Sequence, residues 1–468
     1  MSNIISSANP SDTICAIATP QGVGGLAVVR VSGPQAFDIV SRRWQGRPLA
    51  GMASHTAHLG RVTDGSGQLL DEVVLTLYRA PHSFTGDDVV ELSCHGSRWI
   101  QQQLIVALLD AGCRMAEPGE FTRRALAAGR LDLAQAEAVA DVIAAQSAAA
   151  HRVAMNQMRG SFSRELHDLR DQLLHFVALI ELELDFSEED VTFAQRSEVI
   201  ALAEHMQAVI GRLAASFQTG NAIRNGLPVA IVGQTNAGKS TLLNALLHDD
   251  RALVSDIHGT TRDVIEDTIT LGGTLLRFID TAGIRQSTDE VETMGIERSF
   301  QALDRAQLVL WVIDATTLPS EVTAFSNQIL PHCAGKPLLV VVNKTDLAVP
   351  EPVADALRPL LPDTAQVVAI SAKQTADIER LQQLIVEAAA LPQVDDDTVI
   401  VTNDRHYQAL CRAAEALDRV LNGLCEGLSG DLVSQDIREV IHHLGTITGQ
   451  VTTHDLLGEI FAHFCVGK

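Results

Sequence analysis

Short apolar runs separated by turns dominate the first 130 residues of the chain. Runs such as GLAVVRVSG and DEVVLTLY lie between glycine and proline turns, which is typical of strands. Near residues 97–111 the apolar positions take up helical spacing instead. We therefore expect residues 1–130 to form an α+β domain.

From residue 131 to about residue 225 the pattern is almost purely helical. One apolar stripe, with a residue every three or four positions, consists of Leu166, Leu169, Leu173, Val177, Ile180 and Leu184. This spacing predicts one long helix whose stripe packs in a core. After the turn-like run LPQVDDDT, helical spacing returns over 398–468. We therefore expect residues 131–225 and 392–468 to be the two parts of one discontinuous helical domain.

Between residues 226 and 391 apolar strands alternate with helical segments. The strand runs are VAIVG, LRFIDTAG, LVLWVIDA, KPLLVVVNK and AQVVAISAK, and each ends in polar or glycine-rich sequence. Strands that are apolar throughout and alternate with helices predict a doubly wound, mostly parallel sheet with its ligand at the carboxyl ends of the strands. The chain is thus expected to be multidomain, of the α+β and α/β classes, with this α/β domain inserted into the helical one.

The first polar loop of this region, GQTNAGKS at Gly233–Ser240, fits the phosphate-loop pattern GxxxxGK[ST]. It follows the strand run VAIVG and opens the helical run TLLNALL, as the motif requires. Glycines let the backbone wrap around phosphates, and the helix N-terminus attracts them. We expect Lys239 to reach the β and γ phosphates and the Ser240 hydroxyl to ligate Mg²⁺.

Three later motifs at strand ends indicate a guanine nucleotide. Asp280–Gly283 (DTAG) would bring a carboxylate to the magnesium and an N–H to the γ-phosphate. In Asn343–Asp346 (NKTD), the Asp346 carboxylate can accept two hydrogen bonds from guanine, which adenine does not offer. The backbone N–H groups of Ser371–Lys373 (SAK) are expected to face the guanine O6. Together the four motifs predict GTP binding.

Hydrolysis needs a group that orients water, and the usual one is missing. Ras-like switches carry a glutamine directly after this motif, whereas this chain has Ile284. The acidic candidates downstream are Asp289, Glu290 and Glu292, each of which could equally be a solvated loop residue.

Composition limits the possible binding partners and the cellular location of the protein. The net charge of −23 disfavours binding of polyanions except at a local basic patch. Seven scattered cysteines without a CxxC pair indicate neither a disulfide framework nor a zinc site. The N-terminus lacks the features of a signal peptide, and no apolar run is long enough to span a bilayer. We expect a soluble, cytoplasmic protein without membrane association.

The run VSDIHGTTRD at 254–263, together with the phosphate loop, resembles the MnmE (TrmE) family of tRNA modification GTPases. The terminal FCVGK, GRLDLAQAE at 129–137 and SFTGDD at 83–88 extend the resemblance along the chain. It implies an N-terminal α+β domain (1–130) that binds folate and dimerises. It also implies a discontinuous helical domain (131–225 and 392–468) and an inserted Ras-like P-loop G domain (226–391).

The resemblance also implies a K⁺ ion beside the phosphates, in place of the arginine that other GTPases use. Its ligands would be Asn236, Ser255, Ile257 and Thr260. Thr261 would be a second Mg²⁺ ligand, and Glu292 would orient the attacking water. The GTP-binding residues expected from the motifs and the resemblance are Asn236, Ala237, Gly238, Lys239, Ser240, Thr241, Ser255, Asp256, Ile257, His258, Gly259, Thr260, Thr261, Asp280, Thr281, Ala282, Gly283, Asn343, Lys344, Thr345, Asp346, Ser371, Ala372 and Lys373.

A second ligand implied by the resemblance is a one-carbon tetrahydrofolate, in its 5,10-methylene or 5-formyl form. Its ligands would be Arg30, Glu91, Arg130 and Lys468, although the family commonly has lysine at position 130. Taken alone, Arg30 is expected to be a surface cation, whereas Glu91 lies in an apolar run and needs a partner. Cys465 matches the cysteine of the family's tail, and a buried structural thiol is the alternative to a reactive one.

The function implied is K⁺-stimulated, dimerisation-dependent GTP hydrolysis. It would be coupled to adding the carboxymethylaminomethyl group at C5 of wobble uridine 34 in certain tRNAs. The partners would be a second copy of the chain and the FAD-containing MnmG, in a heterotetramer-type complex. The alternative is a regulatory GTPase switch, for example in ribosome assembly, but the basic RNA-binding module usual in such proteins is not evident. A nucleotide-independent scaffold would leave Lys239 and Asp346 without a role.

Overall fold

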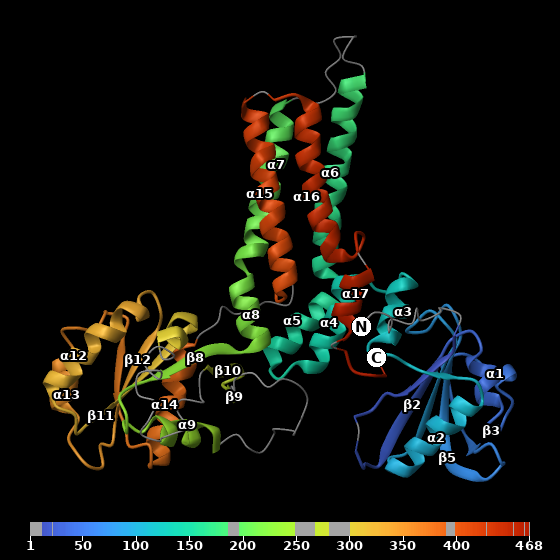
Figure 1. Ribbon diagram of the computed structural model, residues 1–468, viewed down its shortest axis with the longest axis horizontal. Coiled ribbons are helices and arrows are strands. Elements are labelled where there is room, and N and C mark those ends of the chain that lie inside the picture. Colours follow the sequence, from blue (N-terminus) through green and yellow to red (C-terminus); the bar gives the residue numbers. More distant parts are fainter. Residues whose placement is uncertain are drawn as a thin grey trace, which may run out of the picture. The chain divides into compact units, whose positions relative to one another are not determined.

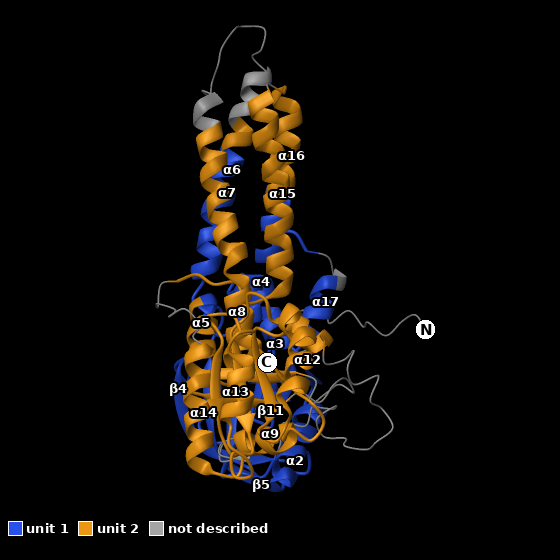
Figure 2. Ribbon diagram, turned by 90° about the vertical axis from the view of Figure 1, so that its left-hand side faces the viewer, with its two compact units in different colours: residues 1–140, 157–175, 441–468 blue, residues 141–156, 176–440 orange. Residues whose placement is uncertain are grey.

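The computed structural model describes residues 12–20, 22–185, 196–248, 267–279, 300–389, 398–426, 428–452, 454–462 and 464–467. It divides into two compact units (Figure 2). The first comprises residues 1–140, 157–175 and 441–468, and the second comprises residues 141–156 and 176–440. Among the described helices, none is long and apolar enough to cross a membrane.

A seven-stranded sheet forms most of the first unit, in the order β3-β4-β5-β6-β2-β1-β7. The described neighbours pair antiparallel except β1 and β7, which are parallel. The strands are β1 Ile14–Ile17, β2 Leu26–Ser32, β3 Trp44–Gln45, β4 Thr56–Thr63, β5 Leu69–Tyr78, β6 Val89–His95 and β7 Arg114–Met115.

Helices α1 (Ala36–Ser41) and α2 (Arg98–Asp110) bury their apolar side chains against one face of this sheet (Figure 1). The 3₁₀ turn η1 (Leu49–Gly51) contributes Leu49 to the same core. The predicted α+β pattern, including the helix near 97–111, is thus confirmed.

The helical segments come from the parts of the sequence before and after the α/β region at 226–391. They are α4 Leu133–Ala144, α5 Ala148–Met158, α6 Ser161–Asp185, α7 Arg196–Ala215, α8 Phe217–Asn225, α15 Asp404–Glu426, α16 Gly430–Thr448 and α17 His454–Ala462. The predicted long helix is α6, and its Leu166, Leu169 and Leu173 are buried. In the second unit, α7 lies along α15 although about 200 residues separate them. Helical segments from before and after the α/β region therefore pack together within the second unit.

The six-stranded sheet of the second unit has the order β13-β12-β11-β8-β10-β9, and only β9 runs antiparallel to its neighbour. The strands are β8 Leu227–Val232, β9 Asp267–Leu271, β10 Thr274–Ile279, β11 Leu308–Asp314, β12 Leu338–Asn343 and β13 Gln366–Ala369. All five predicted strands are present. The sequence analysis missed β9, which pairs with β10 across the Gly272-Gly273 turn.

Helices cover both faces of this sheet (Figure 1). Helices α9 (Lys239–His248) and α14 (Thr375–Ala388) pack in one core, and α12 (Pro319–Ile329) and α13 (Glu351–Leu357) pack in the other, with the 3₁₀ turn η3 (Leu330–Cys333). A parallel sheet that is buried on both faces presents its functional loops at the carboxyl ends of its strands.

Candidate functional site

The phosphate loop joins the buried strand β8 to helix α9, and two of its glycines have no room for a side chain. A Cβ on Gly233 would lie 2.1 Å from the carbonyl oxygen of Val312, and a Cβ on Gly238 would lie 2.2 Å from Asn343 Nδ2. Gly238 also has a positive φ of 97°. The backbone can therefore follow this tight path only with glycine at both positions.

Asn236 adopts a left-handed backbone conformation, with φ of 63°, and is exposed. Asparagine is one of the few side chains that tolerate this conformation. Its carbonyl oxygen is a hard ligand of the kind that alkali and alkaline-earth cations take. The exposed asparagine therefore fits a cation beside the loop.

Lys239 turns its ammonium group back over the phosphate loop. Its Nζ donates hydrogen bonds to the carbonyl oxygens of Gly233 at 2.7 Å and Gln234 at 2.8 Å. Burial lowers the pKa of Lys239. The half-buried Ser240 follows in the first turn of α9, and Thr241 is exposed. A cation and a helix N-terminus thus meet where the motif predicts phosphate binding.

The buried side chain of Asn343 joins three of the predicted motifs. Its Nδ2 donates to the carbonyl oxygen of Ala237 at 3.0 Å, and its Oδ1 accepts from the N–H of Ala372 at 3.0 Å. Asn343 is 2% exposed. One amide therefore ties the phosphate loop to both loops assigned to the base.

Asp346 presents an ionised carboxylate at the base end of the site. Its Oδ1 accepts a hydrogen bond from the Ser371 hydroxyl at 2.9 Å, and its Oδ2 lies 3.3 Å from Lys373 Nζ. The bond from Ser371, followed by the one from Lys373, holds the pKa of Asp346 below its usual value despite some desolvation. A carboxylate that stays charged can accept hydrogen bonds from guanine.

Two N–H groups expected to face guanine O6 have protein acceptors in this structure. The Ser371 N–H donates to Asp377 Oδ2 at 2.7 Å, and the Ala372 N–H donates to Asn343 Oδ1. The loop 371–373 is thus held from both sides by side chains of its own domain.

Sequence reasoning missed Asp314, the last residue of β11. Its Oδ2 lies 2.7 Å from Lys344 Nζ, and its Oδ1 accepts hydrogen bonds from the N–H and hydroxyl of Thr316. Burial would raise the pKa of Asp314, but the bonds from Lys344 and Thr316 outweigh it and lower that pKa. Lys344 has a positive φ of 66°, a conformation that needs such support. The only signal in the sequence was the position of Asp314 at a strand end.

Several expected ligands lie outside the described residues. They are Ser255, Asp256, Ile257, His258, Gly259, Thr260, Thr261, Asp280, Thr281, Ala282, Gly283, Glu292 and Lys468. Within the described ranges, no group of three or more His, Cys, Asp or Glu residues is placed to hold a metal ion.

A second group of polar side chains lies on the sheet of the first unit. In this group, Arg30 of β2 and Glu91 of β6 are direct cross-strand neighbours. Arg30 approaches Glu91 Oε1 with Nε at 2.9 Å and with a terminal nitrogen at 2.8 Å, and the Tyr78 hydroxyl donates to Oε2 at 3.4 Å. The Arg30 guanidinium lies 5.9 Å from the centre of the Phe84 ring and 5.6 Å from that of Phe121.

The expectation that Arg30 is a surface cation is therefore wrong. Its side chain is only 23% exposed, because the cross-strand carboxylate of Glu91 and two aromatic rings surround it. The partner that Glu91 was expected to need is this arginine. An arginine and a carboxylate with partly exposed edges suit a polar, planar heterocycle, so the pair fits a pterin.

The C-terminal tail also reaches this unit. The Gly119 N–H lies 3.4 Å from the carbonyl oxygen of Cys465, and Val466 forms a β-bridge with Pro118. The Cys465 thiol is exposed, which does not fit the alternative of a buried structural thiol. Arg130 is exposed, three residues after the end of α3 (Glu120–Ala127). Its Cγ would lie 3.8 Å from a Cβ on Gly86, in the loop that carries Phe84.

Two family profiles match the chain. The profile described as "MnmE helical domain" matches residues 133–465, and "GTP-binding protein TrmE N-terminus" matches residues 13–130. The chain is 53% identical to "tRNA modification GTPase MnmE" of Parabacteroides distasonis, over 97% of this chain and 100% of that protein. It is also 53% identical to the protein of the same name from Bacteroides thetaiotaomicron, over 98% and 99%.

Among solved structures, the chain resembles Era in complex with MgGDPNP and nucleotides 1506–1542 of 16S ribosomal RNA. The sequences are 31% identical over 40% of this chain and 65% of the Era chain, with a TM-score of 0.27. At that TM-score the likeness adds nothing to the assignment.

Proposed function

Because the chain belongs to the MnmE family of tRNA modification GTPases, we propose that it hydrolyses GTP in the modification of tRNA. In this proposal, hydrolysis is coupled to adding the carboxymethylaminomethyl group at C5 of wobble uridine 34. The relatives' name favours this reaction over a regulatory switch in ribosome assembly.

The observation that carries the GTPase assignment is the position of Asn343. Its amide bridges the phosphate loop at Ala237 and the loop at Ala372, so that Lys239 and Asp346 belong to one connected site. Lys239 would neutralise phosphate charge, and the Asp346 carboxylate would select guanine over adenine.

The remaining groups of the reaction are assigned as follows. Ser240 and Thr261 hold Mg²⁺, and Glu292 orients the attacking water. The ligands of K⁺ are Asn236, Ser255, Ile257 and Thr260. A bound K⁺ supplies positive charge beside the phosphates, where negative charge develops during hydrolysis. The left-handed, exposed Asn236 supports the cation assignment.

We also propose that the first unit binds a one-carbon tetrahydrofolate, as the 5,10-methylene or 5-formyl form. Arg30 and Glu91 would hold its heterocycle, with Arg130 and Lys468 as further ligands. The folate supplies the one-carbon unit for the uridine. The exposed edges of the Arg30–Glu91 pair support this assignment.

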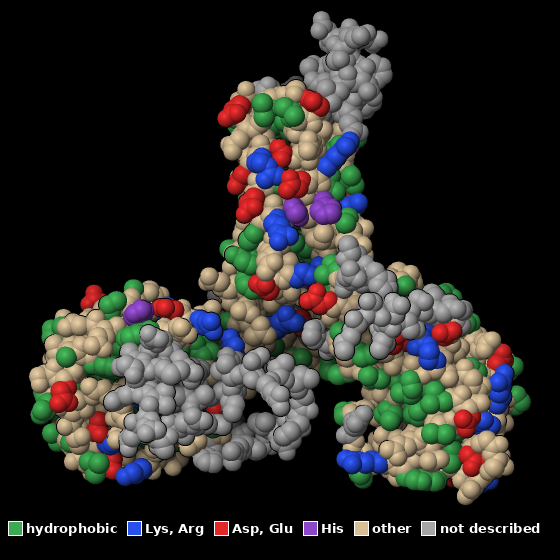
Figure 3. Space-filling view, viewed as in Figure 1, with side chains coloured by type: hydrophobic (Ala, Val, Ile, Leu, Met, Phe, Trp, Pro, Cys, Tyr) green, Lys and Arg blue, Asp and Glu red, His purple; other side chains and the backbone are tan. Residues whose placement is uncertain are grey.

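The protein would act in the cytoplasm as a homodimer, together with the FAD-containing MnmG. Exposed apolar side chains on the N-terminal sheet support dimerisation; Figure 3 shows hydrophobic side chains gathered on part of this unit. Leu59 and Val74 are cross-strand neighbours and are 74% and 41% exposed. The proposed domains are 1–130, 131–225 with 392–468, and 226–391.

Comparison of GTP hydrolysis in KCl and NaCl at equal ionic strength tests the catalytic proposal. We expect K⁺ to stimulate hydrolysis, and we expect Asn236→Ala to abolish most of the stimulation. Thr235→Ala changes an exposed neighbour in the same loop and should behave as the wild type. Equal rates in the two salts would refute the K⁺ site, whereas no hydrolysis in either salt would refute the GTPase itself.

A further inference from the structure

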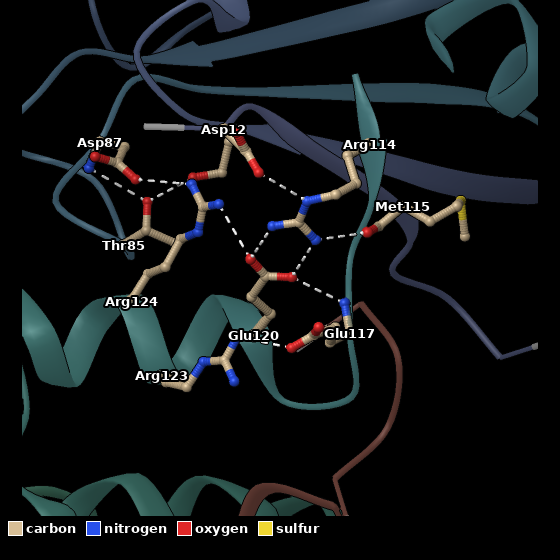
Figure 4. A network of polar contacts seen from close by, with 10 residues as sticks. Asp12, Thr85, Asp87, Arg114, Met115, Glu117, Glu120, Arg123 and Arg124 are labelled. Atoms are coloured by element: carbon tan, nitrogen blue, oxygen red, sulfur yellow. Dashed lines mark hydrogen bonds and ion pairs between the residues drawn. The ribbon is translucent and has the colours of Figure 1, made fainter. Parts of the chain in front are cut away.

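Glu120 is a buried carboxylate at the start of α3, and it accepts four hydrogen bonds (Figure 4). Two come from the terminal nitrogens of Arg114, at 2.8 and 3.0 Å, and one from Arg124 at 3.1 Å. The fourth comes from the N–H of Glu117 at 2.9 Å. Glu120 is 1% exposed, and these bonds offset the energetic cost of burying its negative charge.

The carboxylate stays ionised in spite of its burial. Desolvation would raise the pKa of Glu120, but the bonds from Arg114, Glu117 and Arg124 hold that pKa at about 2. Glu120 is therefore a fixed negative charge at physiological pH. It has no role in the proposed handling of GTP or in the proposed contacts with folate.

Each of the two arginines that bind Glu120 also pairs with a second carboxylate, in another segment of the chain. Arg114, from β7, also binds Asp12 through its Nε at 3.1 Å. Arg124 lies one turn further along α3, and it reaches Asp87 Oδ2 at 3.4 Å. Asp87 belongs to the loop between β5 and β6, so Glu120 and Arg124 together tie α3 to that loop (Figure 4).

This loop and α3 each provide one of the rings beside Arg30. Phe84 comes from the loop, three residues before Asp87, and Phe121 directly follows Glu120. Both ring centres lie within 6 Å of the Arg30 guanidinium. The charge network therefore joins the two segments that carry these rings. Among the hydrogen bonds described, Glu120 itself contacts neither Arg30 nor Glu91.

The same carboxylate stabilises the turn 117–120, which contacts the C-terminal tail. The bond from the Glu117 N–H to Glu120 closes the turn 117–120. In that turn, Pro118 forms the bridge to Val466, and the Gly119 N–H faces the carbonyl of Cys465.

We propose that Glu120 is a positioning residue for the one-carbon folate site, acting through the loop at residues 80–88. The inference rests on the proposed folate binding. Glu120→Gln keeps the shape of the side chain but removes the charge that two buried guanidinium groups share. Arg124, which reaches Asp87 in the loop that carries Phe84, loses the charged partner that holds it in place. The affinity for folate therefore falls, while hydrolysis of GTP by the other unit is unchanged.

The test is a calorimetric titration of the full-length protein with 5-formyltetrahydrofolate. We expect Glu120→Gln to raise the dissociation constant by about tenfold or more, the usual scale for losing hydrogen bonds to a charge. Glu117→Gln is the matched control, because it removes a half-exposed carboxylate that pairs with Arg123 in the same turn. Its affinity should equal that of the wild type.

A double-mutant cycle with Phe84→Ala separates positioning from general destabilisation. If Glu120 acts through the loop, Glu120→Gln weakens binding much less in the Phe84→Ala background than in the wild type. Fully additive effects would overturn the proposal, and so would a Glu120→Gln protein that binds folate as well as the wild type.

Two further variants make the result decisive. If Glu120→Gln does not fold, Arg124→Gln replaces it, because this change cuts the link to Asp87 and leaves the Arg114–Glu120 pair in place; unchanged affinity in Arg124→Gln would overturn the proposal. Arg30→Ala tests the folate site itself. A wild-type protein that binds no folate, or an Arg30→Ala protein that binds it normally, refutes the folate site. Loss of binding in Arg30→Ala with normal binding in Glu120→Gln refutes only the role of Glu120.

Discussion

Asp314, the last residue of β11, holds Lys344, the residue directly after β12, through an ion pair of 2.7 Å. Lys344 has a left-handed backbone and lies in the same turn as Asp346, the proposed guanine ligand. The side chains of Asp314 and Lys344 are 17% and 29% exposed, so solvent screens the pair only in part. The ion pair therefore supports the strained turn.

We predict that Asp314→Asn raises the KM for GTP by about tenfold and changes kcat little, because the turn loses a charged anchor while the phosphate loop keeps its contacts. Steady-state hydrolysis measures both constants. Asp304→Asn is the control, since it breaks an exposed pair with His332 in the same domain. A fall in kcat at unchanged KM would contradict this role of Asp314.

Gly238→Ala is predicted to weaken nucleotide binding by more than tenfold, since a Cβ would meet Asn343 Nδ2 at 2.2 Å. Asn343 is buried and has both amide groups bonded, so it cannot move away without losing two hydrogen bonds, a loss of about 2 kcal/mol. Titration with a fluorescent GDP analogue measures the effect.

Gly335→Ala serves as the control for Gly238→Ala. Gly335 also has a positive φ, of 74°, but no atom lies within 4 Å of its added Cβ. It should lose only the roughly 1 kcal/mol of a strained backbone and bind nucleotide normally. Equal losses of binding in the two variants would mean that the contact with Asn343 is unimportant.

The fold was largely predictable because each element leaves a local pattern. The five parallel strands and the helix α6 follow from apolar runs and spacing alone. Strand β9 was missed because DTITL is short and polar, although the following Gly272-Gly273 signals a hairpin.

Sequence motifs name Lys239 and Asp346 directly, and the structure places both in segments that Asn343 joins. The partners of Arg30 and Lys344 were not predictable, because the contacts span 61 and 30 residues and depend on which strands become neighbours. Glu120 was missed for a different reason: its partners Arg114 and Arg124 are only six and four residues away, but its burial arises only in the folded unit.

Gly467→Ala is predicted to dislodge the C-terminal tail and weaken folate binding. Gly467 has a φ of 102°, and a Cβ there would lie 2.3 Å from the carbonyl oxygen of Ile17. Because Ile17 is part of β1, the strand cannot give way. Gly458→Ala in α17 is the control, since nothing lies within 4 Å of its added Cβ and alanine favours a helix. Normal folate binding by Gly467→Ala would contradict a role for the seated tail.

The stability of the first unit should depend on pH because of Glu120. Its pKa falls from 4.5 to about 2 on folding, so its charge stabilises the folded state above about pH 4.5, and this contribution is lost as the pH falls towards 2. Glu120→Gln should therefore lower the free energy of unfolding by about 3 kcal/mol or less at pH 7. The difference from the wild type should shrink as the pH falls from 4.5 to 2. Denaturant unfolding at several pH values measures it, and a difference that does not change with pH would contradict the assignment.

Nucleoside analysis of tRNA is the direct test of the proposal that this GTPase modifies the wobble uridine. Cells that lack the protein should have lost the carboxymethylaminomethyl group at uridine 34. Expression of the wild type should restore the group, and expression of Asp346→Asn, which lacks the carboxylate for guanine, should not. Wobble uridines that are unchanged in cells without the protein would contradict the claim, whatever the rate of GTP hydrolysis in vitro.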